Sequence, residues 1–292
     1  MKYKILILSL IMLSFGVNAE IITGDSCGDD CTWSLENGIL TVTGSGSINN
    51  YAEGAGVTDA PWFEYQEDIT KIVIQNKSES EKFTTIGNSA FEYMQSVKEV
   101  VLPDSIETLG YAAFFASPSL DTINLPSNLK NLGGWALDHT ALSSIELPEG
   151  IKTIGDVALR FSDMTSVYLP SSLFEGETPG ISMYAFSRSN IQTIYCAKGD
   201  EKCAAYQPFE CTGFGGDPEG GDCIEDTYEM PIRIETYQKE SNGKYVSNGV
   251  RYSSFDDMQK GQNGVELKRI YTVEEANAVA KPTGNTVRIK YR

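Results

Sequence analysis

A short phrase recurs four times in this sequence at a nearly constant interval. It reads Val-Val-Leu-Pro at 100–103, Ile-Asn-Leu-Pro at 123–126, Ile-Glu-Leu-Pro at 145–148 and Val-Tyr-Leu-Pro at 167–170. Its prolines are 23, 22 and 22 residues apart. A repeat of this length is typical of solenoids, in which each coil is too small to bury a core alone and is stabilised by its neighbours.

A second phrase follows the first in each repeat. It contains a glycine and, three residues later, an alanine followed by a large apolar residue. The copies run from Gly87 to Phe91, Gly110 to Phe114, Gly133 to Leu137 and Gly155 to Leu159, and a later one ends in Ala185-Phe186. The sequence therefore contains at least five coils.

The residue types within a coil predict its local structure. Apolar and polar residues alternate in the first phrase, so Ile123 and Leu125 should face inward, and Thr122 and Asn124 outward. Proline lacks an amide donor, so each Leu-Pro pair should end a strand. We expect the glycines to supply a bend and the small alanines to let a helical or 3₁₀ turn pack closely.

Together the phrases resemble the repeat of the BspA-like leucine-rich-repeat family, L-x-x-I-x-L-P-x-x-L-x-x-I-G-x-x-A-F, from about Ile69 to Cys196. The departures are Leu137 and Leu159, where Phe is usual, and an insertion at 174–180. The resemblance implies a secreted or surface protein and adhesion to host matrix proteins or other cells. It implies no shared catalytic motif, so we predict no catalytic residue and no enzyme activity.

We therefore predict a β-rich α/β fold: a leucine-rich-repeat solenoid with one parallel sheet, a β-rich N-terminal cap and a small α+β C-terminal domain. The predicted segments are a signal peptide at 1–19, the cap at 20–68, repeats with a C-terminal disulfide cap at 69–212, an acidic glycine-rich linker at 213–225 and the C-terminal domain at 226–292.

Residues 1–19 have the pattern of a secretory signal. Lys2 and Lys4 precede an apolar run that ends at Phe15, and the small Ala19 suits a signal peptidase. The run is too short to be counted as a membrane span. We expect the mature chain to be secreted or at the cell surface, without a transmembrane segment.

Two local predictions concern the ends of the chain. In the cap, strands at 32–35 and 39–43 should pair around Asn37-Gly38, a hairpin turn pair. In the C-terminal domain we expect strands at 230–238, 244–252, 266–271 and 287–291, and helices at 254–260 and 272–281.

Six cysteines in an exported chain favour disulfides, and fifteen pairings are possible. Pairing of sequence neighbours is our preferred hypothesis: Cys27 with Cys31, Cys196 with Cys203, and Cys211 with Cys223. A zinc site is disfavoured because no close C-x-x-C pair occurs and His139 is the only histidine. We predict no metal site and no cofactor.

The formal charge of −17 is unevenly distributed. Residues 20–222 contain 30 acidic and 10 basic residues, whereas residues 225–292 are nearly balanced. The acidic body should repel nucleic acid and anionic membrane and attract a basic protein surface. The alternative is that the acidity only keeps an exported protein soluble.

Outward residues of the first phrase should form ladders across a concave sheet face. One ladder ends in Asn124, Glu146, Tyr168 and Tyr195, and its companion in Thr122, Ser144, Ser166 and Thr193. Two tyrosines beside small hydroxyl residues suit contact with a protein or a glycan. The alternative is that the tyrosine pair only stabilises the sheet.

The preferred function is therefore an exported binding protein that adheres to a host or neighbouring-cell protein, or to a glycan, through this face. One alternative is a structural component of the envelope with the repeats as a spacer. A second is a hydrolase with an unrecognised carboxylate pair. His139 is interpreted as a solvated loop residue.

Overall fold

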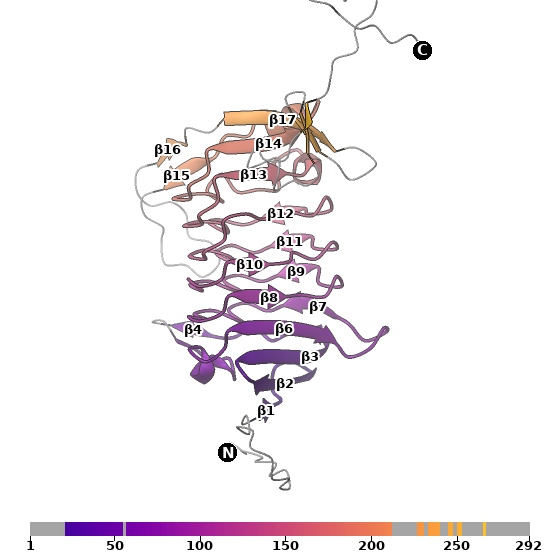
Figure 1. Cartoon of the computed structure of the whole chain (residues 1–292), viewed down its shortest axis with the longest axis vertical. Helices are drawn as coiled ribbons and strands as arrows, with labels where there is room; N and C mark the ends of the chain where they lie inside the picture. The colour runs from indigo at the N-terminus through magenta and orange to yellow at the C-terminus, as the bar shows by residue number, and fades with distance from the viewer. Residues whose placement is uncertain are drawn as a thin grey trace, which may run out of the picture. The chain divides into compact units, whose positions relative to one another are not determined.

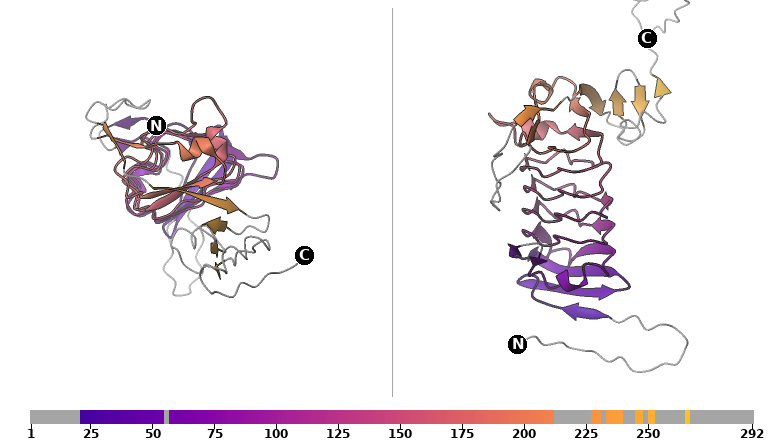
Figure 2. Two further views of the ribbon diagram at one scale, coloured as in Figure 1. Left: turned by 90° about the horizontal axis from the view of Figure 1, so that it is seen from above. Right: turned by 90° about the vertical axis from the view of Figure 1, so that its left-hand side faces the viewer.

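The computed structural model describes residues 21–54, 57–211, 227–230, 233–239, 245–247, 250–252 and 265–266. The chain divides into two compact units, residues 1–235 and 236–292. The first unit is a stack of coils that contains the repeats, and the coils superpose when it is seen from above (Figure 1, Figure 2). The predicted signal peptide and linker lie outside the described residues.

A three-stranded cap begins the first unit. Its strands are β1 (Ile22–Gly24), β2 (Asp30–Glu36) and β3 (Ile39–Ser47), paired antiparallel in that order. Asn37 and Gly38 join β2 to β3 with φ of 51° and 76°, the left-handed pair that a tight hairpin needs. The predicted hairpin is confirmed, and it is longer than predicted.

Two parallel ladders follow the cap (Figure 1). The first contains β6 (Lys71–Asn76), β8 (Glu99–Val101) and β10 (Thr122–Ile123). The second contains β7 (Phe83–Ile86), β9 (Thr108–Leu109), β11 (Asn131–Leu132) and β12 (Thr153–Ile154). β3 pairs with both β6 and β7 and so joins the two ladders.

The second ladder corrects the sequence analysis, which expected strands only from the Leu-Pro phrase. The residues before each repeat glycine also pair, because each coil places them beside the same residues of the next coil, as at Leu109 and Leu132. Conversely, the phrase at 144–147 forms no strand. Ile145 nevertheless faces the core, with 4% of its surface exposed.

The remaining strands of the first unit are β13 (Ser166–Leu169), parallel to β14 (Thr193–Ala197), and the antiparallel pair β15 (Phe209–Cys211) and β16 (Thr227–Glu229). Short elements connect the strands: β4 (Glu53–Gly54), β5 (Val57–Thr58), η1 (Phe63–Tyr65), η2 (Ser171–Phe174) and α1 (Glu201–Ala204).

The helical turn predicted for the Ala-Phe phrase is wrong in the described coils. Residues such as Ser89 and Tyr93 have φ of 52° and 61°, and left-handed residues cannot continue a right-handed helix. Their backbone amides bond to the next coil instead: Phe91 N–H donates to Ala113 O at 2.8 Å and Tyr93 N–H to Phe115 O at 2.8 Å. These bonds between coils alternate with bonds inside each turn, such as Phe115 N–H to Ala112 O at 3.1 Å, so the segment is a series of turns and not a helix.

The repeat glycines are required by close approach between coils. A Cβ placed on Gly133 would lie 2.6 Å from both the carbonyl carbon and the oxygen of Gly110. A Cβ on Gly110 would lie 2.7 Å from the backbone nitrogen of Asn88. The predicted bend is therefore not the main constraint, because the backbones of successive coils nearly touch at this column.

An apolar column fills the interior of the stack. Phe91 and Phe114 stack with ring centroids 5.3 Å apart, and Leu137, Leu159 and Phe186 occupy the equivalent buried positions of later coils. Trp62, from the cap, stacks on Phe91 at 4.9 Å, and its Nε1 donates to Ala90 O at 2.7 Å. The cap thereby covers the apolar end of the first coil.

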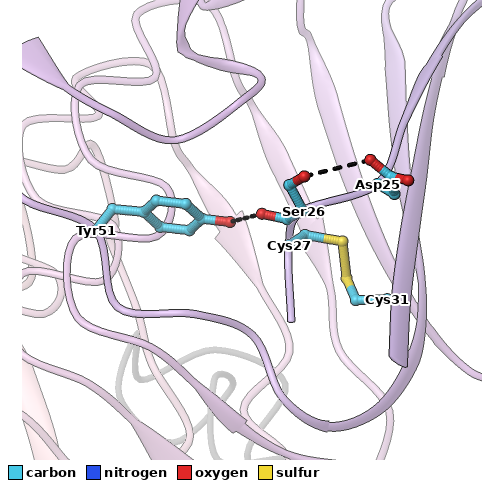
Figure 3. The surroundings of a disulfide bond; sticks show 5 residues. All are labelled: Asp25, Ser26, Cys27, Cys31 and Tyr51. Atoms are coloured by element: carbon cyan, nitrogen blue, oxygen red, sulfur yellow. Dashed lines mark hydrogen bonds between the residues drawn. A yellow bond between two sulfur atoms is a disulfide. The ribbon is translucent and has the colours of Figure 1, made fainter. Parts of the chain in front are cut away.

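Disulfides fasten both ends of the stack. Cys27–Cys31 lies in the cap beside Tyr51, whose hydroxyl donates to Ser26 O at 3.4 Å (Figure 3). Cys196–Cys203 ties β14 to α1, and the Asp200 carboxylate caps α1 by accepting from the Cys203 amide. Both predicted pairs are confirmed, whereas Cys223 of the third pair lies outside the described residues.

The second unit contains short antiparallel strands. The end of β17 (Arg233–Lys239) pairs with β18 (Tyr245–Ser247), which pairs with β19 (Val250–Tyr252), which pairs with β20 (Val265–Glu266). The single strand predicted at 244–252 is therefore two strands, and the Asn-Gly pair at 248–249 was the overlooked turn signal. The helices at 254–260 and 272–281 and the strand at 287–291 lie outside the described residues.

Candidate functional site

The predicted outward ladders form wherever the strands pair. Lys71 is opposite Glu99, and their side chains form an ion pair at 2.8 Å. Tyr168 is opposite Tyr195 on β13 and β14. Ser166 is likewise opposite Thr193. The structure therefore places these residues on the strands in the neighbour relationships that the repeat predicts.

The C-terminal part of the predicted site is buried. Tyr168 and Tyr195 are only 4% and 7% exposed, and Ser166 and Thr193 are buried with them. The hydroxyl of Tyr168 donates to Glu149 Oε2 at 2.9 Å. β13 and β14 are thus covered on both faces, and in this conformation their side chains offer no open aromatic surface.

The N-terminal part of the site is open. Asn124, Ser144 and Glu146 are exposed, as is Thr122 in the companion ladder. The Asn124 side chain also has a structural role: its Oδ1 accepts from the Leu102 amide at 3.0 Å and its Nδ2 donates to Leu102 O at 2.9 Å. We call these four residues the open sheet face. It presents polar groups to an approaching molecule.

Sequence reasoning missed a cluster on the turns. The Asp138 carboxylate is fully buried, and its Oδ2 accepts from Arg160 Nε at 3.0 Å and Nη2 at 2.6 Å. Its Oδ1 lies 2.8 Å from His139 Nδ1, and the His139 side chain is 43% exposed. His139, predicted to be a solvated loop residue, is therefore partly exposed and lies against a buried carboxylate. The available signal was spacing, because Asp138 and Arg160 are one repeat apart.

Burial raises the pKa of two tyrosine hydroxyls. It raises the pKa of Tyr206, whose hydroxyl donates to Ser182 O at 2.7 Å. Burial, and secondarily the charge of Asp59, raises the pKa of Tyr51. Both side chains therefore act as neutral hydrogen-bond donors that hold loops in place.

The described residues contain no cluster of three or more His, Cys, Asp or Glu side chains suited to a metal ion. They also contain no helix with the length and apolarity needed to cross a bilayer.

The stacked parallel strands, the column of buried apolar side chains and the short repeat define a leucine-rich-repeat solenoid. The family described as a BspA type leucine rich repeat region matches residues 59–192 in six copies. The repeat body of this chain is therefore a BspA-type leucine-rich-repeat region, as the sequence resemblance predicts.

Solved structures of several bacterial leucine-rich repeat proteins are similar to this chain to different degrees. A leucine-rich repeat protein of Eubacterium ventriosum is 17% identical with a TM-score of 0.53, and the match covers 78% of this chain and 49% of that protein. A leucine rich repeat protein of T. pallidum is 19% identical with a TM-score of 0.40, covering 53% and 63%. A leucine rich cell surface protein of Faecalibacterium prausnitzii is 16% identical with a TM-score of 0.37, covering 75% and 59%.

The first of these likenesses shows the fold alone. This chain spans about half the length of the Eubacterium ventriosum protein. No curated protein matches the chain significantly.

Proposed function

We propose that this chain is an exported binding protein that holds a partner protein against the open sheet face. The observation that carries the proposal is the exposure of Thr122, Asn124, Ser144 and Glu146 on successive coils, beside an interior that is already filled. The stability of a solenoid comes mainly from its interior and from contacts between neighbouring coils, so most outward side chains are available for recognition. The proposal assigns the chain no catalytic step.

Export is supported by the disulfides together with the signal sequence. Cys27–Cys31 and Cys196–Cys203 are both closed in the structure. Disulfides persist in oxidising compartments, and the sequence of residues 1–19 has the charge and apolar pattern of a secretory signal. We place the protein outside the cytoplasm, secreted or at the cell surface.

The acidic body indicates the charge of the partner. Residues 20–222 carry three times as many acidic as basic residues, and such a field speeds encounter with a basic protein surface. We therefore expect binding to a partner protein that is basic near its contact site, and binding should weaken as salt concentration rises.

The test uses the chain from residue 20 to 292 and a panel of immobilised extracellular-matrix proteins and glycans. The variant Thr122→Arg/Ser144→Arg fills the open sheet face without removing a buried group. Its matched control, Thr84→Arg/Thr153→Arg, makes the same charge change on exposed positions of the second ladder. Loss of protein binding only in the first variant supports the proposal. Equal binding by both variants contradicts it. Binding to glycans alone also contradicts it, because the partner would then be a glycan and not a protein.

A further inference from the structure

Each coil presents two consecutive residues at the outer end of its second phrase. These pairs are 92–93, 115–116, 138–139, 160–161 and 187–188, and we call them the turn ridge. The second residue of every pair is left-handed, with φ between 51° and 61°. Because the same conformation recurs in each coil, the turn-ridge side chains of one coil lie beside those of the next.

The rings of the turn ridge form a continuous row. Tyr93 and Phe115 have ring centroids 5.6 Å apart, Phe115 and His139 5.8 Å, and His139 and Phe161 4.2 Å. Trp135 supports the row from below, 5.3 Å from Phe115. Phe161 is 37% exposed and is one of few large apolar side chains exposed in the described part of the chain. The exposed end of the row, at His139 and Phe161, therefore offers an interaction surface.

Both arginines of the body lie beside the same row. Arg160 and Arg188 are the only arginines between residues 20 and 232. Their guanidinium carbons lie 5.2 Å and 5.6 Å from the centroid of the Phe161 ring. His139, the only histidine of the chain, packs on the same ring. These are cation–π and stacking distances.

The carboxylates of the turn ridge are buried. The acidic residues among its ten positions are Glu92 and Asp138, and both are fully buried. Asp138 pairs with Arg160, and Arg188 is an exposed side chain. An otherwise acidic body thus carries an aromatic strip with an exposed arginine at its end.

We propose that the turn ridge is a second docking surface, and that it takes a segment of a partner protein with a carboxylate next to an apolar side chain. The apolar group packs on Phe161 and His139, and the carboxylate accepts from the Arg188 guanidinium. Arginine and aromatic residues are the side chains that dominate protein interfaces. An acidic glycan fits less well, because a chain of negative charges would meet the repulsion of the whole acidic body.

The experiment selects a phage-displayed library of random peptides on the chain from residue 20 to 292. The variants are Phe161→Asn, because asparagine tolerates the left-handed conformation, and Arg188→Gln, which replaces an exposed charged side chain with a neutral polar one. Circular dichroism checks that both fold. We expect the selected peptides to contain Asp or Glu beside a large apolar residue. Both variants should bind these peptides at least tenfold more weakly than the parent chain does.

The sheet-face variant Thr122→Arg/Ser144→Arg separates the two proposals, because it should leave binding of these peptides unchanged. The ridge proposal is overturned if the selected peptides lack acidic residues. It is also overturned if they bind both ridge variants as tightly as the parent chain. Binding of a sulfated or uronic-acid glycan array that is lost in the same variants also overturns it, because the partner would then not be a protein.

Discussion

Asp138 and Arg160 form an ion pair between neighbouring coils in the wall of the solenoid. Two guanidinium nitrogens, Nε and Nη2, bond to the same carboxylate oxygen, Oδ2, at 3.0 and 2.6 Å. The Asp138 side chain is fully buried and that of Arg160 is 10% exposed. The guanidinium also lies 4.4 Å from the Trp135 ring centroid, so the pair is closed off from water on its aromatic side.

Removal of one partner of this ion pair should be strongly destabilising. In Asp138→Leu the buried guanidinium loses its carboxylate, and we expect the free energy of unfolding to fall by roughly 3–5 kcal/mol. The double variant Asp138→Leu/Arg160→Met removes both charges and should recover most of that loss. Guanidinium chloride unfolding of the chain from residue 20 to 292 measures both. Equal losses in the single and double variants would show that charge burial is not the cause.

The glycine column gives a second prediction. Gly133→Ala places a Cβ within 2.6 Å of the Gly110 backbone, so two coils must separate, and we expect a loss of about 1–3 kcal/mol. Gly150→Ala is the matched control, because a Cβ there meets no atom within 4 Å. Thermal unfolding compares the two variants. A Gly133→Ala melt as high as that of Gly150→Ala would contradict the proposed close approach.

Much of the fold could be predicted because each coil repeats the same local signals. Alternation in the Leu-Pro phrase placed Ile145 inward and Glu146 outward, and the Asn37-Gly38 turn located the cap hairpin. The second ladder and the left-handed turns could not be read in the same way. Their hydrogen bonds go to the next coil, so their conformation depends on a neighbour that a single phrase does not contain.

The sequence predicts on which face the side chains of the candidate site lie, but not how exposed they are. Period two fixes the face on which Tyr168 and Tyr195 lie, but burial depends on what packs over that face. The charge pairs between coils were overlooked in the sequence, although their spacing was a usable signal. Asp138 and Arg160 are 22 residues apart and Glu107 and Lys130 are 23 apart, and both form ion pairs. Opposite charges separated by one repeat therefore indicate contact in a solenoid.

The assignment of faces can be tested at one strand phrase. Ile145 is buried, so Ile145→Ala should remove core contacts and cost roughly 2–5 kcal/mol. Glu146 is exposed, so Glu146→Ala should change the free energy of unfolding by less than about 0.5 kcal/mol. Chemical denaturation measures the free energy of unfolding of both variants. Equally mild losses would mean that the inward and outward faces are wrongly assigned.

The last prediction concerns pH at the cap. Lys77 Nζ donates to both oxygens of Asp30, at 3.1 and 2.9 Å, and Ser45 donates to Oδ2 at 3.0 Å. These hydrogen bonds, with that of Lys77 the largest, hold the pKa of Asp30 below its ordinary 3.8. A lowered pKa means that the contribution to stability is present above pH 3.8 and is lost as the pH falls through the pKa of the folded state.

Lys77→Gln should therefore raise the pKa of Asp30 toward its ordinary value and remove this part of the pH dependence of stability. Carbon NMR titration of the Asp30 carboxyl measures the change directly. Lys82→Gln is the control. It removes the same charge from the same loop, but Lys82 pairs with Glu79 and not with Asp30. Since the Asp30 side chain is 44% exposed, added salt should weaken the effect of Lys77. An Asp30 titration that is identical in the parent chain and in Lys77→Gln would show that the ion pair is not formed in solution.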